Sequence, residues 1–455
     1  MPCRSVISID HSSSSSFLPM QLTRLRSETF TLLQKMVDVQ PGETPALLSG
    51  FCYFFTLLCS YYLLRPLRDA MGLVGGADEL QWLFTLTFVA MLCLVPVFGW
   101  LVRRLAPRSF VTVVYRFFAA NILLFSLLIA LGVREQHVAR FFFVWVSVYN
   151  LFVVSIFWSV LADRFTPAQG KRLFGFIAAG GTAGTFAGPA LAAGLAGTLG
   201  PVALTLAAAV LLEISLLCCR RLLRGAHAGS ADGASQAAGT NSGIGGSILG
   251  GATLILRSPY LIAIVCYMFL HTSAATFLYF EQGRIVAESV MGTAARTRFF
   301  AQVDLLVSAL TLLLQLFVTG RLMRRFGVTL LLMLLPLAAI TAFGLVAMWP
   351  GLLVLAIMQG VRRAADFALA RPAREVLFTV LTREAKYKAK NFIDTVVYRG
   401  GDAVSGWISA GFSSLGMGFA AVAAMMLPFS LLWLWLARWL GRQQEQSATL
   451  NQPQE

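Results

Sequence analysis

The chain has 455 residues, of which 57% are hydrophobic and 13% are charged, and its mean hydropathy is +0.74. These values exclude an ordinary soluble protein of this length. The net charge of +15 would suit nucleic-acid binding, but most of the 36 lysines and arginines lie in loops and termini on one side of an alternating membrane topology. This asymmetry follows the positive-inside rule, so it predicts cytoplasmic N and C termini and no nucleic-acid partner.

The apolar runs are about 20 residues long, which is enough for a helix to cross a hydrocarbon core of ~30 Å. We therefore predict an all-α polytopic membrane protein with about twelve transmembrane helices. The first six are expected at 45–64, 80–102, 109–132, 138–162, 173–197 and 201–219. The second six are expected at 259–280, 300–320, 328–349, 351–378, 392–414 and 418–440.

The segments outside these spans set the expected domain organisation. Residues 1–44 contain a serine run and are expected to form a disordered cytoplasmic segment. Residues 223–256 are rich in Gly, Ala and Ser, which is typical of a flexible linker. We therefore expect a first six-helix bundle at 45–222, a second at 257–442, and a polar tail at 443–455.

Two apolar runs end in nearly the same sequence. Residues 99–106 read GWLVRRLA and residues 320–327 read GRLMRRFG. At almost the same offset, GGTA at 180–183 recurs as GGDA at 400–403. This repeat predicts two similar helix bundles with a solute site where they meet. The two loops are interpreted as orientation anchors or as gating elements, and the residues concerned are Gly99, Arg103, Arg104, Gly320, Arg324 and Arg325.

Small residues recur along one side of the fifth span, at Gly180, Gly181, Gly184 and Gly188. Such a stripe lets two helices approach closely, so we expect a packing or sliding interface there. The sequence contains no phosphate-binding loop of the form GxxxxGK[ST]. The seven cysteines form no metal or disulfide pattern, and no nucleophile–base set is visible. We therefore expect no cofactor, no metal and no enzymatic activity.

Ionisable side chains inside a membrane cost at least ~2.5 kcal/mol near its centre, so each one is a functional candidate. Arginine predominates among them, which favours a buried anion-binding surface because guanidinium groups donate in pairs and keep their charge. The sequence RPLRD at 65–69 recurs as RPARE at 371–375, where Glu375 can pair with Arg371 four residues earlier. The substrate-binding candidates from these motifs are Arg65, Arg68, Asp69, Arg371, Arg374 and Glu375.

The tenth span carries further charges. Asp366 follows Arg362 and Arg363 by four and three residues and can pair with either. Arg363 and Arg374 are about three helical turns apart and share a face, so we expect both to reach an anionic solute. The alternative is that these arginines pair with acids of other helices and only hold the bundle together.

In the eleventh span, Asp394, Tyr398 and Asp402 recur at intervals of four residues, and Arg399 precedes Asp402 by three. Either Arg399 and Asp402 form a pair with polar packing around it, or one of the aspartates binds a coupling proton or cation. The candidates for coupling or charge pairing are Asp304, Asp366, Asp394, Arg399 and Asp402. His271 is interpreted as a hydrogen-bonded packing residue.

The loops at 99–106 and 320–327 resemble the signature of the major facilitator superfamily. A closer resemblance is to the ATP/ADP translocases of plastids and intracellular bacteria. It is carried by YLLRPLRD at 62–69, by FW at 157–158 with KRLFG at 171–175, and by RE at 374–375 with KYKAKNFID at 386–394. The resemblance implies binding roles for Arg68, Asp69, Arg374, Glu375, Lys388 and Lys390.

Two departures limit what the resemblance implies. The functional lysine of that family's first helix is Arg68 here, and the acids of its fourth and seventh helices are absent around 146–147 and 274–275. The resemblance therefore implies a major facilitator-like fold and an anionic substrate more strongly than it implies ATP/ADP exchange.

These patterns together favour a secondary-active transporter in a bacterial inner membrane. Its expected partners are the lipid bilayer and a small, anionic, phosphorylated solute, with ATP/ADP-type exchange as the specific form. One alternative is a proton-coupled carrier of another small molecule that uses Asp304 or Asp394. Another is a membrane sensor or assembly protein built on a transporter scaffold, which would bind a ligand without moving it.

Overall fold

The computed structural model describes residues 39–40, 42–104, 107–224, 253–349, 351–382, 385, 389–390 and 392–450. These residues are predominantly helical, and there is no strand among them. Most of the expected disordered segment, most of the expected linker and Lys388 lie outside the described residues. Within the described part, the prediction of an all-α polytopic membrane fold is confirmed.

The first half contains six long helices. They are α2 (Thr44–Met71), α3 (Leu80–Arg104), α4 (Pro107–Ala130), α5 (Glu135–Arg164), α6 (Pro167–Leu195) and α7 (Gly200–Arg224), with the short η1 (Ala77–Glu79) before α3. The predicted end of the first span at residue 64 is wrong, because α2 continues to Met71. The charged residues after position 64 have partners inside the protein, so they do not have to lie in a loop.

The second half is less regular. Its elements are α9 (Pro259–Ser289), α10 (Thr293–Leu314), η4 (Gln315–Thr319), α11 (Gly320–Met348), α12 (Leu352–Ala365), η5 (Asp366–Ala370), α13 (Arg371–Leu377), η6 (Ile393–Val397), α15 (Tyr398–Ser414) and α16 (Phe419–Leu450). The three η elements of this half are π-helical. Gly327 has a φ of 73°, which breaks α11 into two helices.

The number of spans depends on this break and on the charged helices. Among the described residues, nine segments are long and apolar enough to cross a membrane. One of them, Thr293–Met348, contains two helices because the chain turns at Gly327. The remaining two spans are α12–η5–α13 and η6–α15, whose charges and π-turns interrupt the apolar pattern.

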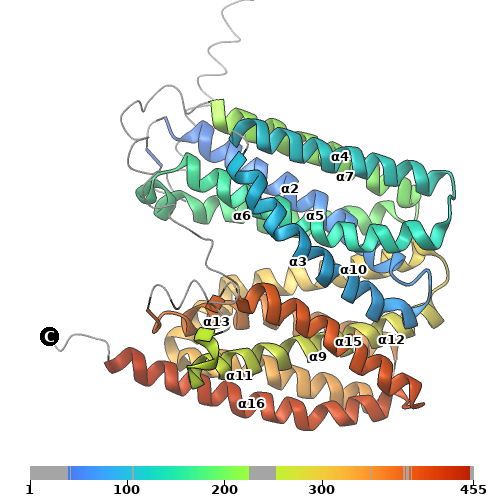
Figure 1. The fold of residues 1–455 in the computed structure, drawn as a ribbon, viewed down its shortest axis with the longest axis vertical. Coiled ribbons are helices and arrows are strands. Elements are labelled where there is room, and N and C mark those ends of the chain that lie inside the picture. Colours follow the sequence, from blue (N-terminus) through green and yellow to red (C-terminus); the bar gives the residue numbers. More distant parts are fainter. Residues whose placement is uncertain are drawn as a thin grey trace, which may run out of the picture.

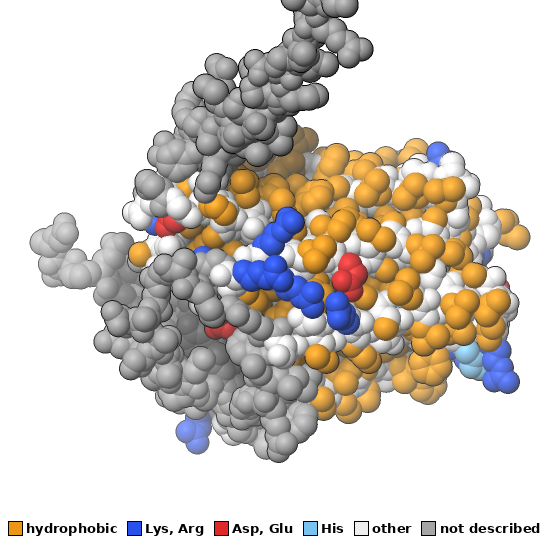
Figure 2. Space-filling view, turned by 90° about the horizontal axis from the view of Figure 1, so that it is seen from above, with side chains coloured by type: hydrophobic (Ala, Val, Ile, Leu, Met, Phe, Trp, Pro, Cys, Tyr) orange, Lys and Arg blue, Asp and Glu red, His pale blue; other side chains and the backbone are white. Residues whose placement is uncertain are grey.

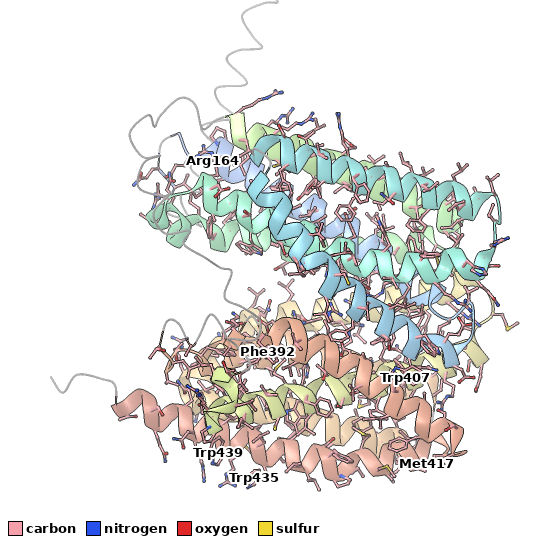
Figure 3. All side chains as sticks on the ribbon, viewed as in Figure 1. Arg164, Phe392, Trp407, Met417, Trp435 and Trp439 are labelled. Carbon is pink, nitrogen blue, oxygen red and sulfur yellow. The ribbon has the colours of Figure 1, made fainter. Side chains whose placement is uncertain are left out.

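The helices form two groups, one above the other in Figure 1, with α2–α7 in the upper group and α9–α16 in the lower. Each group has its own apolar core. Tyr53, Tyr115 and Phe157 are fully buried in the first, and Phe343 and Trp433 are fully buried in the second. Figure 3 shows Trp435 and Trp439 on the outer side of α16, where Trp435 is exposed, as expected of a surface that faces lipid.

A third apolar cluster joins the two halves at one end, and we call it the apolar seal. It is made by Leu73, Leu80 and Phe143 of the first half with Phe280 and Phe300 of the second. Beside it, the indole nitrogen of Trp407 on α15 donates to the Thr85 hydroxyl on α3 at 3.0 Å (Figure 3). The seal lies at the end of the bundle opposite to the described ends of the chain, next to the turn between α2 and α3.

Candidate solute site

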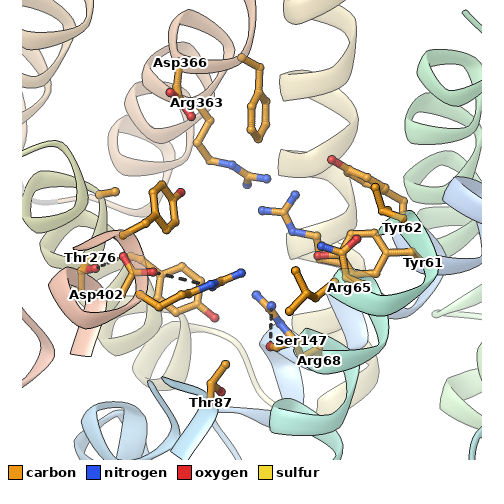
Figure 4. Close-up of a pocket in the computed structure, with 18 of the residues that line it drawn as sticks. Tyr61, Tyr62, Arg65, Arg68, Thr87, Ser147, Thr276, Arg363, Asp366 and Asp402 are labelled. Atoms are coloured by element: carbon orange, nitrogen blue, oxygen red, sulfur yellow. Dashed lines mark hydrogen bonds and ion pairs between the residues drawn. The ribbon is translucent and has the colours of Figure 1, made fainter. Parts of the chain in front are cut away.

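A cavity of about 500 Å³ lies between the two halves (Figure 4). The first half lines it with side chains from α2, α3, α5 and α6, and the second half with side chains from α9, α12, η5, α13 and α15. This size falls in the range of pockets that hold small-molecule ligands. The site therefore lies where the repeat in the sequence led us to expect one.

The cavity is lined by more basic than acidic side chains. Among the described residues, six arginines line it, namely Arg65, Arg68, Arg362, Arg363, Arg371 and Arg399. Two aspartates, Asp366 and Asp402, line it as well, and two more, Asp69 and Asp304, pair with these arginines directly. Even when all four acids are ionised, these described side chains carry two positive charges in excess.

Asp304 on α10 links the two halves through arginines from both. The Arg363 guanidinium on α12 lies 2.6 Å from one carboxylate oxygen of Asp304. The Nε of Arg65 on α2 lies 3.6 Å from the other oxygen. Asp304 is only 2% exposed, so this acid is a buried counterion shared by the first and second halves.

A second ion pair lies on α2, at the boundary between the cavity and the apolar seal. Arg68 donates from Nε and Nη2 to one oxygen of Asp69, at 2.9 and 2.6 Å, and from Nη1 to the Ser147 hydroxyl at 3.3 Å. The hydroxyl of Tyr279 on α9 donates to the same Asp69 oxygen at 3.0 Å. This network connects the wall of the solute site to a residue of the opposite half.

The second half holds two more charge groups. Asp366 lies 3.4 Å from Arg371 Nε and 3.7 Å from the Nε2 of His271. Asp402 lies 3.8 Å from Arg399 and accepts a hydrogen bond from the Thr276 hydroxyl at 3.2 Å (Figure 4). His271 is buried and lines the cavity, and its Nδ1 has no hydrogen-bond partner among the described residues.

Arg362 differs from the other five arginines of the cavity. Each of those has a carboxylate within ion-pair distance, whereas Arg362 has none among the described residues. Its Nε donates to the neutral side-chain oxygen of Gln359 at 3.0 Å. Arg362 is 4% exposed, so it is a buried cation that lines the cavity and has no described carboxylate within ion-pair distance.

The pairings predicted for the tenth span are wrong, because η5 is a π-helix. Asp366 pairs with Arg371, five residues later, instead of with Arg362 or Arg363. Five residues is the hydrogen-bonding interval of a π-helix, so the pairing rule for α-helices does not apply here. The extra residue also rotates everything that follows around the helix axis.

This rotation separates Arg363 from Arg374, which were expected to share a face. Arg363 lines the cavity, whereas Arg374 is outside its lining and donates to the Met268 thioether at 3.3 Å. The predicted pair of Glu375 with Arg371 is likewise absent, because Glu375 pairs with Lys390 at 2.5 Å on an exposed surface. Asp394 is exposed and is also outside the cavity lining.

The proposed gating loops lie away from this site. Gly99 is in α3, and the side chains of Arg103 and Arg104 are outside the described residues. Arg324 and Arg325 are exposed, and Arg324 donates to the carbonyl of Gly320 in its own helix. No carboxylate pairs with either of these two arginines among the described residues.

The glycine stripe of α6 packs closely on α2. A Cβ at Gly180 would lie 2.5 Å from the carbonyl oxygen of Phe51, and one at Gly188 would lie 2.9 Å from that of Cys59. Added atoms at Gly181 and Gly184 would also clash with α2. The stripe therefore lets the two backbones approach more closely than larger residues would permit.

Sequence reasoning missed Arg362. It favoured the neighbouring Arg363, which the structure pairs with Asp304. Consecutive helical residues point about 100° apart, so only one of two adjacent arginines can face a given acid of a neighbouring helix. Gln359, three residues before Arg362, is a neutral partner that the sequence could have indicated.

No protein-family model and no curated protein matches the sequence. Solved transporter structures do match over nearly their whole length. The nucleoside transporter NupG matches with a TM-score of 0.61 and 13% identity, covering 90% of this chain and 100% of that one. The chain has a major facilitator-like fold.

Two further structures agree with this fold. A POT family transporter in complex with 5-aminolevulinic acid has a TM-score of 0.61 and 12% identity, covering 87% of this chain and 96% of that one. A bacterial homologue of the human lysosomal transporter Spinster, inward-facing and unoccupied, has a TM-score of 0.54 and 14% identity, covering 90% and 98%. Identities this low establish the fold alone, so the function has to be argued from the cavity.

Proposed function

We propose that this protein is a secondary-active transporter of a small anionic, phosphorylated solute, and that it works by alternating access. The observation that carries the proposal is Arg362, a buried arginine that faces the cavity without a carboxylate partner. A buried cation without an ion-pair partner is costly unless a ligand supplies one. A phosphate group is a fitting counterion, because its oxygens accept paired hydrogen bonds from a guanidinium fork.

Aromatic side chains in the same cavity favour a solute that also carries a ring. Tyr61, Tyr62, Phe84 and Tyr398 line it together with the arginines. Such faces pack against a nucleobase or a similar planar group. A nucleotide unites both features, in agreement with the resemblance to ATP/ADP translocases.

The missing acids of that family also bear on the solute. Ser147 stands near one of these positions and accepts a hydrogen bond from Arg68, while Ala275 lines the cavity near the other. Neutral residues here add no further acid to the cavity, so its lining keeps an excess of positive charge, which favours a multiply charged anion over a neutral or cationic compound.

Alternating access is supported by the distribution of contacts between the halves. The apolar seal, the bond from Trp407 to Thr85 and the bond from Tyr279 to Asp69 lie at or near one end. We propose that the bundles 45–222 and 257–442 rock about the cavity and open it alternately to each side. We further propose that both termini lie in the cytoplasm, so that the end with the apolar seal is the outer end.

The test is uptake of labelled ATP by bacterial cells that express the protein, with and without excess unlabelled ADP outside. Exchange predicts that ADP competes with uptake and triggers efflux from preloaded cells. Arg362→Gln should abolish both at an equal level of membrane insertion. The proton-coupled alternative predicts a different result. Cells would take up neither ATP nor other phosphate esters, but would take up a neutral compound, and that uptake would stop when the proton gradient is dissipated. ATP binding by purified protein without flux in proteoliposomes would support a sensor.

A further inference from the structure

The outer face of α4 and α7 carries charged side chains, although both helices are long and apolar enough to cross a membrane. These helices cover the first half on the side away from the second half (Figure 1). Arg116, Arg221 and Arg224 are exposed there, while Glu213 and Arg220 are half-buried. Figure 2 looks onto this face and shows a row of basic side chains, with an acidic one beside it, among hydrophobic side chains. We call these five residues the α4–α7 strip.

Arg220 of the strip reaches across to the side of α4 that also carries Arg116. Arg220 on α7 donates to the Thr112 hydroxyl on α4 at 3.5 Å. Arg116 lies one turn after Thr112, and side chains on a helix lean toward its N-terminus, so Arg116 leans toward Thr112 as well. Neither arginine makes an ion pair with a carboxylate among the described residues, which leaves both available to an outside anion.

The fold itself does not require these charges. In the register of the repeat, where Gly99 corresponds to Gly320, the counterpart of Arg116 is Leu337 on α11. Leu337 is exposed too, so the same place in the second half is apolar. Arg116 lies within the apolar span Ser109–Ala130, where an arginine is costly without a partner.

We propose that the α4–α7 strip binds the headgroup of an anionic phospholipid. Four arginines and one glutamate give it a positive excess that complements a phosphodiester, and bilayer lipid is the medium that covers this face. The surface around the charges fits the acyl chains. The exposed apolar side chains on the two helices include Val113, Phe117, Val210, Ile214 and Leu217.

Native mass spectrometry of the full-length protein, released from detergent with added phosphatidylglycerol or phosphatidylcholine, tests the proposal. The wild type should bind phosphatidylglycerol more tightly than phosphatidylcholine. The double variant Arg116→Gln/Arg220→Gln should weaken phosphatidylglycerol binding about tenfold or more, and leave phosphatidylcholine binding unchanged. Glu213→Gln should strengthen phosphatidylglycerol binding. If the double variant does not fold, the Glu213→Gln variant tests the proposal, and unchanged or weaker phosphatidylglycerol binding would overturn it.

The matched control removes two exposed arginines from α16, with Arg438→Gln/Arg442→Gln. It should keep wild-type affinity for phosphatidylglycerol. An equal loss of phosphatidylglycerol affinity in the control would mean that general surface charge attracts the lipid. That result would overturn the proposal that the α4–α7 strip binds it. Equal wild-type affinity for the two lipids would overturn it too. A wild-type dimer that the Arg116→Gln/Arg220→Gln variant dissociates would show that a second copy of the chain occupies this face instead.

Discussion

Replacement of Arg362 by glutamine tests the solute site most directly. The variant removes the one cavity arginine without a carboxylate partner among the described residues and keeps a polar side chain beside Gln359. A hydrogen bond to a charged partner is worth about 1.5–3 kcal/mol. Loss of that interaction with a bound anion corresponds to a roughly 10- to 150-fold increase in Kd. Arg362→Lys keeps the positive charge but loses the guanidinium fork, so we expect an increase in Kd that is smaller than that of Arg362→Gln.

The assay is the solute-induced rise in Tm of the purified protein, titrated with ATP, ADP and inorganic phosphate. Arg374→Gln is the matched control, because Arg374 lies outside the cavity lining and donates to a thioether. Its Kd should stay within about twofold of the wild type, since no charge near the solute changes.

The same experiment separates binding from structural support. In the absence of solute, Arg362→Gln should not lower Tm, because it removes a buried cation that has no described carboxylate within ion-pair distance. If Arg362 only stabilised the bundle, Tm would fall and the Kd of the folded fraction would be unchanged. That result would refute the assignment, as would a larger loss of affinity in Arg374→Gln than in Arg362→Gln.

Three further predictions concern the scaffold. Asp304→Asn removes the buried acid shared by two arginines, so it should destabilise the solute-free protein by about 3–5 kcal/mol, and a saturating anion should restore part of the lost Tm. Gly180→Ala should cost about 1–3 kcal/mol, because its Cβ meets a carbonyl oxygen of α2 2.5 Å away. Burial raises the pKa of Glu43, but the backbone amide of Gln40 and the Arg172 guanidinium outweigh burial and hold this pKa below its ordinary value. The stability that the Glu43 carboxylate contributes should therefore be complete at neutral pH and decline below about pH 4.5.

Each of these predictions has its own control. For Asp304→Asn, an unchanged Tm would mean that the two arginines do not need this acid. For the glycine stripe, Gly175→Ala is matched because nothing lies within 4 Å of its Cβ, and an equal loss in both alanine variants would contradict the packing argument. For Glu43, the difference in Tm between the wild type and Glu43→Gln should shrink as the pH falls from 7 to 4, and a constant difference would contradict the role given to its charge.

The sequence by itself determined the membrane fold. Hydropathy is a local property, so the apolar runs predicted where most helices cross the bilayer, and the repeated GxLxRR loops predicted two similar halves. It also indicated an arginine-rich interior, because charges in apolar runs are visible without a structure. The first span was still predicted to end too early, because Arg65 and Arg68 interrupt the apolar run and their acidic partners are known only from the structure.

Only the tertiary structure decided which arginines are free. Arg363 is neutralised by Asp304, which is distant in sequence and reaches it only because α10 packs against α12. The π-helix η5 shifts the pairing interval from four residues to five, so Asp366 forms an ion pair with Arg371. Arg374 consequently lies outside the cavity lining. Arg362 then remains as the buried cavity arginine that has no described carboxylate within ion-pair distance. A charge can be read from the chain, but its neutralisation depends on which helices meet, and that is a property of the packed bundle.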